Sequence, residues 1–203
     1  LEQEKIKLQS YDTALLELTR PKVLDFGAGP GVLAGELSSQ GLLVKAYDIS
    51  SEMLDKAAAR IGEQNVIRHA MDIPENYFDF VICNLVLCIV PDVEVQSVLQ
   101  EIYRTLSFNG RALIGFCNPR LFQTRESRLD FRFPTGDPYE KNHRYRKVKK
   151  EGGYEIMEDH RPMEWYENEF AKAGFRLLKT HFTPKYDLGG VEIQDFVIFE
   201  LVK

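Results

Sequence analysis

The glycine-rich stretch VLDFGAGPGV, at positions 23–32, constrains the fold of this 203-residue chain more than any other feature. It starts with apolar, β-prone residues, and glycines alternate with other residues from Gly27 to Gly31. Such a turn reaches positive φ angles without a steric penalty and lets backbone N–H groups approach a ligand. Apolar residues at helical spacing follow from Val32. The stretch therefore predicts a buried parallel strand, a tight turn and a helix, which together form a ligand site in an α/β sheet.

Two common phosphate-binding motifs do not match this turn. The dinucleotide fingerprint requires Gly-x-Gly-x-x-Gly, whereas the third glycine, Gly31, comes one residue too early. Neither Gly-Lys-Ser nor Gly-Lys-Thr is present, so a Walker-type phosphate loop is excluded as well. Asp25 stands directly before the turn, where its carboxylate would repel a pyrophosphate and attract an ammonium group. The turn therefore favours a ligand with a cationic group.

Two further carboxylates are expected at the ends of the next strands. The segment LLVKAYDIS, at 42–50, predicts a second buried strand that ends at Asp48. This residue lies about 20 residues beyond the turn, where a carboxylate can accept hydrogen bonds from both ribose hydroxyls. The segment NVIRHAMDI, at 65–73, predicts a third strand followed by Asp72. The series of carboxylates at successive strand ends indicates an adenosine-containing ligand.

The remaining pattern continues the alternation of strands and helices. Ser50 or Ser51 is expected to cap a helix that ends near Gly62. The other predicted elements are an N-terminal helix over 4–18, a fourth strand within 77–92, a helix over 93–106, a fifth strand over 106–116, an irregular basic insertion over about 118–161, a helix that opens at Pro162 and ends at Gly174, and two final strands over 175–182 and 191–201.

These motifs resemble those of the class I S-adenosylmethionine (SAM) methyltransferases. Asp-x-Gly-x-Gly-x-Gly resembles motif I of that family, and the run ending at Asn84 resembles motif IV. The His-Arg-Pro at 160–162, before an aromatic helix, resembles small-molecule members. The resemblance implies an α/β fold, a three-layer Rossmann-like sandwich whose mostly parallel seven-stranded sheet has an antiparallel C-terminal strand. It also implies one domain over 1–203, with the insertion at about 118–161 serving as a substrate lid.

The resemblance assigns roles at the cofactor site. Asp25 would meet the methionyl ammonium, Asp48 the ribose, and Asp72 the adenine amino group, while Ile49 and Met71 would pack on the adenine ring. For the two apolar residues the alternative is packing in the core, and for Asp72 a solvated turn. The predicted SAM-binding residues are Asp25, Gly27, Ala28, Gly29, Asp48, Ile49, Met71, Asp72 and Asn84. The product would be S-adenosylhomocysteine (SAH), and no metal is expected.

The acceptor would bind under the insertion, which is rich in Lys and Arg. A local basic surface favours an anionic acceptor, whereas the alternative is a solvated loop. His143 and His160 have the pKa range of a general base and are the predicted catalytic residues, although lone histidines are more often structural. The predicted substrate-binding residues are Tyr139, Arg144, Arg146, Tyr154, Arg161 and Trp165. Asn84 is not followed by Pro-Pro, which argues against methylation of the adenine N6 atom.

Composition narrows the class of function. No apolar run approaches the roughly 20 residues of a membrane span, and three cysteines without paired spacing favour a reducing compartment, the cytoplasm. We therefore predict a monomeric or homodimeric enzyme that transfers a methyl group from SAM to a small polar acceptor by O- or N-methylation. One alternative is a tRNA or other RNA methyltransferase, against which the net charge of −5 argues. A second alternative is a SAM-binding regulatory subunit without activity.

Overall fold

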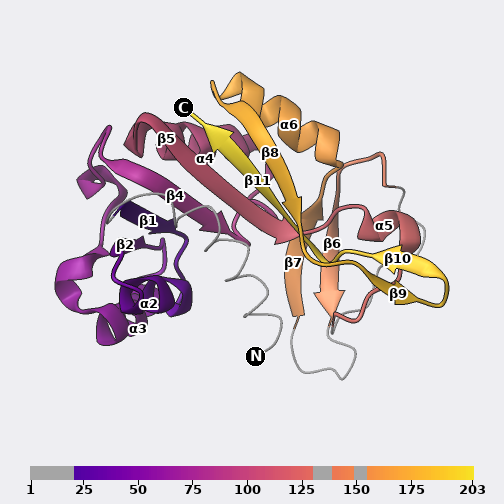
Figure 1. Cartoon of the computed structure of the whole chain (residues 1–203), viewed down its shortest axis with the longest axis horizontal. Helices are drawn as coiled ribbons and strands as arrows, with labels where there is room; N and C mark the ends of the chain where they lie inside the picture. Colours follow the sequence, from indigo (N-terminus) through magenta and orange to yellow (C-terminus); the bar gives the residue numbers. More distant parts are fainter. Residues whose placement is uncertain (1–20, 130–138, 149–154) are drawn as a thin grey trace.

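A computed structural model describes residues 21–129, 139–148 and 155–203 of the chain (Figure 1). The helix expected over 4–18 and the predicted substrate residue Tyr154 lie outside the described residues. Within them, the chain forms a central sheet flanked by helices, together with two separate two-stranded sheets.

The central sheet has seven strands in the order β3-β2-β1-β4-β5-β11-β8. Strand β11 runs antiparallel to both of its neighbours, and the other pairs are parallel. This arrangement confirms the predicted Rossmann-like fold class. The strands are β1 (Lys22–Phe26), β2 (Leu43–Tyr47), β3 (Val66–Ile67), β4 (Phe78–Asn84), β5 (Leu106–Cys117), β8 (Arg176–Phe182) and β11 (Phe196–Val202).

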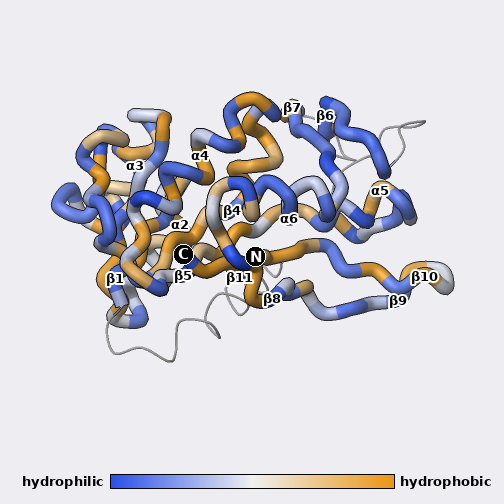
Figure 2. Tube along the Cα trace, turned by 90° about the horizontal axis from the view of Figure 1, so that it is seen from above, coloured by the Kyte–Doolittle hydropathy of each residue, from blue (hydrophilic) through white to orange (hydrophobic). Residues whose placement is uncertain are grey.

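Alternate side chains of the strands supply two cores, one on each face of the sheet. Val23 packs in a cluster with residues of α2 (Val32–Ser39) and α3 (Ser51–Ile61). Leu24, the next residue, packs in a cluster with residues of α4 (Asp92–Thr105) and α6 (Met163–Lys172). The period of two that a strand imposes thus places helices on both faces. Figure 2 shows the hydrophobic colouring concentrated around β5 and β11 in the middle of the molecule.

The helix ends follow the sequence signals. The Ser50 side chain accepts a hydrogen bond from the Met53 N–H at the start of α3. Pro162 directly precedes α6, and Gly174 follows it with a φ of 96°, a value that suits glycine. The predicted helix boundaries at Ser50, Pro162 and Gly174 are therefore confirmed.

Three predicted elements need correction. The third strand covers only Val66–Ile67, and a 3₁₀ turn at Ala70–Asp72 replaces the rest of the predicted segment. The strand expected over 191–201 is divided into β10 (Val191–Ile193), which pairs with β9 (Tyr186–Leu188), and β11. The insertion contains a short helix, α5 (Leu121–Thr124), and an antiparallel hairpin of β6 (His143–Val148) and β7 (Glu155–His160), which we call the lid hairpin. Its inward-facing residues are largely polar, so the sequence carries no apolar alternation to reveal it.

Candidate active site

The glycine turn between β1 and α2 is shaped by close contacts. Gly27, Gly29 and Gly31 have φ angles of 76°, 53° and 72°. The N–H groups of Gly27 and Ala28 both donate to the carbonyl of Tyr47, at 2.8 and 2.9 Å. A Cβ on Gly27 would lie 2.2 Å from the Val86 side chain, whereas a Cβ on Gly29 would have no atom within 4 Å. The turn thus packs tightly on one side and leaves room beside Gly29.

Asp48 is held at the rim of this turn by two backbone groups. One carboxylate oxygen accepts a hydrogen bond from the Gly29 N–H at 2.8 Å, and the other accepts one from the Ser50 N–H, also at 2.8 Å. A carboxylate oxygen has two lone pairs, so each can accept a further donor. The carboxylate is therefore fixed in place and can still bind a diol.

Asp25 is buried beneath the turn. Its side chain is 2 % exposed, and its Oδ2 atom has no hydrogen-bond partner among the described residues. Burial raises the pKa of this carboxyl to about 7, a hydrogen bond from the backbone at Ala34 opposes the shift, and the negative charge of Asp48 adds to it. A buried carboxyl oxygen without a partner fits a site that receives a cationic ligand group.

Ile49 and Met71 lie on the surface near the ends of β2 and β3. Their side chains are 94 % and 88 % exposed, so neither is a core residue. Asp72 is also exposed, at the end of the 3₁₀ turn. Two apolar side chains beside a fixed carboxylate offer surfaces on which a planar ring can pack. The residues present at this edge of the sheet thus fit an adenosine cofactor.

The loop after β4, residues 85–91, lies against the glycine turn, and we call it the transfer loop. It begins after Asn84, the last residue of β4, with Leu85 at a φ of 60°. The Leu85 N–H donates to the Gly115 carbonyl at 2.7 Å. Val86, the next residue, is the one that contacts Gly27. The end of β4 and the predicted cofactor turn therefore share a direct contact.

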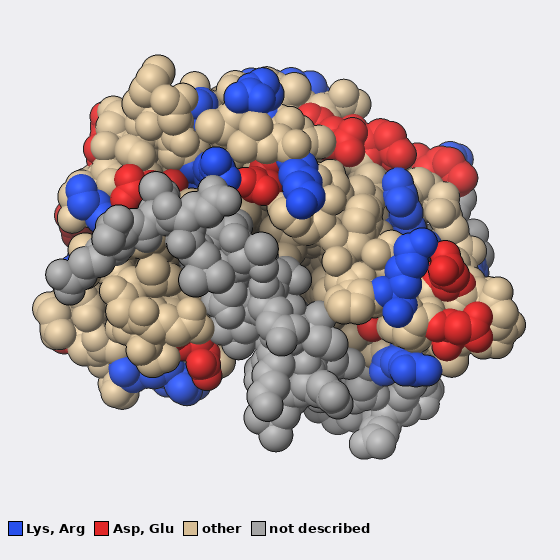
Figure 3. Space-filling model, in the orientation of Figure 1, with Lys and Arg blue, Asp and Glu red and all other residues tan. Residues whose placement is uncertain are grey.

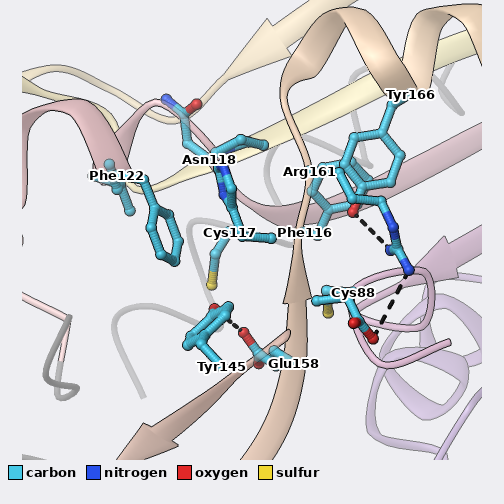
Figure 4. Close-up of a pocket in the computed structure, with 13 residues that line it drawn as sticks. Cys88, Phe116, Cys117, Asn118, Phe122, Tyr145, Glu158, Arg161 and Tyr166 are labelled. Atoms are coloured by element: carbon cyan, nitrogen blue, oxygen red, sulfur yellow. Dashed lines mark hydrogen bonds and ion pairs between the residues drawn. The ribbon is translucent and has the colours of Figure 1, made fainter. Parts of the chain in front are cut away.

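The lid hairpin encloses a pocket against the end of β5. Figure 4 shows Tyr145 and Glu158, on opposite strands of the hairpin, pointing toward each other. The Tyr145 hydroxyl donates to Glu158 at 2.6 Å, and the Lys147 ammonium donates to the other oxygen of Glu158 at 2.9 Å. Other residues that line the pocket are Cys88, Phe116, Cys117, Asn118, Phe122 and Tyr166. The pocket thus combines aromatic walls with a buried carboxylate.

The two predicted catalytic histidines are neighbours across the hairpin. His143 pairs with His160 in the strand register, and their ring centroids are 4.8 Å apart. The Phe122 ring packs against the His160 ring in a tilted arrangement, with ring centroids 4.1 Å apart. The His160 Nε2 atom lies 2.8 Å from the Tyr139 carbonyl, and the His143 Nδ1 atom lies 3.0 Å from the Lys141 carbonyl. Since a carbonyl only accepts, each of these two nitrogens carries a hydrogen.

Comparison with known proteins agrees with this geometry. Residues 24–114, which include the glycine turn, Asp48, Asp72 and the transfer loop, match the family model described as a methyltransferase domain. The chain contains a class I, SAM-dependent methyltransferase domain. The match ends within β5, so it covers the cofactor half of the chain and leaves the lid hairpin outside.

Relatives and solved structures extend the comparison. The chain is 31% identical over 123 residues to a biotin biosynthesis bifunctional protein, BioHC, from Cellvibrio japonicus, and covers 24% of it. It is 32% identical over 122 residues to a ubiquinone biosynthesis O-methyltransferase from Rickettsia bellii, and covers 48% of it. These alignments take in 58% and 57% of this chain, which thus spans half or less of either relative. A SAM-dependent methyltransferase structure from Mesorhizobium loti superposes with a TM-score of 0.73 over 98% of both chains at 17% identity, a likeness of fold.

The predicted substrate residues take different positions. Tyr139 is buried, and its hydroxyl accepts a hydrogen bond from the Met163 N–H at 3.1 Å. Arg161 is 0% exposed and donates to the protein's own loop. Trp165 lies beneath the Arg161 guanidinium, 4.9 Å away. Among the described residues, these three side chains therefore support the base of the lid hairpin.

The basic side chains of the lid hairpin are mostly matched by acids. Arg144 and Arg146 lie on its exposed side, and Arg146 pairs with Glu155 at 3.4 Å. Lys147 pairs with Glu158 on the inward side. On the face shown in Figure 3, Lys and Arg side chains lie among Asp and Glu side chains wherever described residues are visible. The lid hairpin thus carries little uncompensated positive charge.

Sequence reasoning missed several residues that shape the site. Tyr145, Lys147 and Glu158 form the buried polar group of the pocket, and Val86 closes one side of the glycine turn. Tyr145 and Lys147 are separated by one residue, as side chains on one face of a strand are, but two residues are too few to predict a strand. In the described ranges no helix is long and apolar enough to cross a membrane, and no group of side chains there could hold a metal ion.

Proposed function

We propose that this protein transfers the methyl group of SAM to an oxygen or nitrogen atom of a small polar acceptor. The observation that carries the proposal is Asp48, which is fixed by the Gly29 and Ser50 N–H groups next to the open space at Gly29. When bound, SAM supplies an electrophilic methyl group on its sulfonium. The protein then needs to orient the acceptor and to exclude water.

Each residue at the cofactor end has a proposed role. Asp48 accepts hydrogen bonds from the ribose hydroxyls, and Asp72 accepts one from the adenine amino group. Ile49 and Met71, which are otherwise exposed, cover the two faces of the ring. Asp25 meets the methionyl ammonium through its unpartnered oxygen. Gly27, Ala28 and Gly29 line the turn, and Asn84 borders the methyl-transfer position.

The pocket beneath the lid hairpin is the proposed acceptor site. Phe116, Phe122 and Tyr166 supply aromatic surface, and Glu158 supplies an acceptor for a hydroxyl or amino group. His143 or His160 takes the proton if the acceptor is a hydroxyl. The ubiquinone biosynthesis O-methyltransferase, which is 32% identical to this chain over 122 residues, supports a small-molecule acceptor. The mixed charge of the face shown in Figure 3 weighs against an RNA substrate.

Calorimetry on Asp48 variants tests the cofactor assignment. Asp48→Ala removes hydrogen bonds to a charged group, and we expect SAM affinity to fall by about 1.5–3 kcal/mol. Asp48→Asn keeps one acceptor oxygen and should bind SAM with intermediate affinity. Wild-type affinity in Asp48→Ala, or equal binding of NAD by the wild type, would disprove the assignment. Formation of SAH with a panel of small acceptors then separates an enzyme from a SAM-binding regulatory subunit.

A further inference from the structure

Arg161 is the most deeply buried basic residue in the described part of the chain, and its side chain borders the pocket beneath the lid hairpin. It stands between the end of β7 and the start of α6 and is 0% exposed. Its guanidinium lies over the Trp165 ring and donates to the Tyr166 hydroxyl at 3.3 Å. Figure 4 shows the side chain extending from the lid hairpin toward Tyr166, with Cys88 below it.

The other donors of Arg161 all reach the transfer loop or the residue that follows it. Nη1 donates to the Leu87 carbonyl at 2.6 Å, and Nη2 donates to the Val90 carbonyl. Nε donates to the Asp92 carboxylate at 2.6 Å, at the start of α4. The planar guanidinium presents several donors in a fixed geometry, which suits it to bind several acceptors at once. One side chain thus fixes both the middle and the end of the transfer loop.

The loop held in this way has an unfavourable backbone conformation at its start. Leu85 has a φ of 60°, in the left-handed region that residues other than glycine rarely adopt. Such a residue persists only where its surroundings fix it. Val86, directly after it, packs on Gly27 of the cofactor turn. The conformation of the loop therefore determines where Val86 lies beside the glycine turn.

We propose that Arg161 is a positioning residue that holds the transfer loop against the glycine turn and thereby links the lid hairpin to the cofactor site. This inference rests on the proposed function, because it concerns the same cofactor site. A second contact joins the same two elements, since the Asp159 N–H donates to the Cys88 carbonyl at 2.6 Å. Arg161 borders the proposed acceptor pocket, but its hydrogen bonds are made to the protein itself, so it acts through the loop.

The test measures SAH affinity by calorimetry in Arg161→Met and in Arg161→Met combined with Leu85→Gly. The single variant releases the loop, and we expect SAH to bind about twofold to thirtyfold more weakly, as for other coupled positions. Glycine adopts a φ of 60° at no steric cost, so the second change removes the strain that Arg161 opposes. The double variant should therefore regain part of the SAH affinity, although its melting temperature stays below that of the wild type.

Phe175→Leu is the matched control for a general loss of stability. Phe175 is a buried residue that packs on Tyr103 beyond the opposite end of α6. Phe175→Leu should lower the melting temperature and leave SAH affinity unchanged. Equal SAH affinity in Arg161→Met and the wild type, or no rescue by Leu85→Gly, would overturn the positioning role alone. Failure of the wild type to bind SAH would overturn the proposed function, and the positioning role with it.

Discussion

The contact between Gly27 and Val86 makes a quantitative prediction about Gly27→Ala. Gly27 has a φ of 76°, and an L-residue pays about 1–2 kcal/mol for a left-handed conformation. The new Cβ would also lie 2.2 Å from the Val86 side chain, an overlap of the kind that costs about 1–3 kcal/mol in a packed site. We expect the free energy of unfolding to fall by about 2–5 kcal/mol, a large part of the roughly 5–15 kcal/mol that stabilises a domain.

Two other glycines separate the backbone contribution from the contribution of the overlap with Val86. Gly190, in the β9–β10 hairpin, has a φ of 89°, and a Cβ there would have no atom within 4 Å. Gly190→Ala should therefore lose only the backbone contribution and keep full SAM affinity. Gly29→Ala has similarly open surroundings, so its stability loss should match that of Gly190→Ala. Its Cβ would occupy the proposed cofactor space, however, and SAM binding should weaken strongly.

Urea denaturation measures the loss of stability, and calorimetry measures the loss of SAM affinity. Val86→Ala removes the methyl group that meets the new Cβ. Combined with Gly27→Ala, it should therefore restore the part of the stability that was lost through the overlap. The coupling energy of this double-mutant cycle reports the overlap alone. The reasoning is refuted if Gly27→Ala loses no more stability than Gly190→Ala, or if the cycle shows no coupling.

Two further predictions concern charge. The folded-state pKa of Asp25 is raised to about 7, above its unfolded value of about 3.9, so the folded protein holds the proton and stability should fall as pH rises from about 4 to about 7. An ammonium beside Asp25 favours the ionised form of its carboxyl, so SAM binding at pH 7 should release a proton. The release is measured as a difference in binding enthalpy between buffers of different ionisation enthalpy. Asp25→Asn should remove that difference. Equal enthalpies for the wild type would contradict this role. Arg144 and Arg146 lie on the exposed side of the lid hairpin, and Arg146 is paired with Glu155, so replacing both by Gln should leave SAM affinity and the KM of the acceptor nearly unchanged. A raised KM for a carboxylate- or phosphate-bearing acceptor, with a weaker dependence on salt, would show instead that these charges attract an anionic acceptor.

The cofactor end of the molecule was largely predictable because its signals are local. Gly27 and Gly29 have the positive φ angles that the alternating glycines predicted. Asp48 and Asp72 follow successive neighbouring strands of a parallel sheet, so the fold itself brings them to one edge. The third strand was predicted too long because its apolar pattern continues into the 3₁₀ turn before Asp72.

The lid end was less predictable because its residues depend on distant partners. The sequence suggests that Arg161 binds a substrate, since its chemistry suits an oxyanion. In the structure its donors reach Leu87 and Val90 on the transfer loop and Asp92 at the start of α4, which lie 69 to 74 residues earlier in the chain. Similarly, the density of Lys and Arg in the insertion suggests an anionic partner. Only the hairpin register places Glu155 and Glu158 beside those charges.

The position of β11 has a consequence for how the chain folds. All of its residues are buried between β5 and β8, and the insertion, α6 and β8 all come before it in the chain. Strand β5 therefore keeps an open edge until a distant segment pairs with it, a non-local step that is intrinsically slow. The closing loop includes the whole lid, yet each doubling of a flexible loop adds only about 0.6 kcal/mol of entropic cost. The length of the lid can thus change during evolution with little effect on the stability of the sheet.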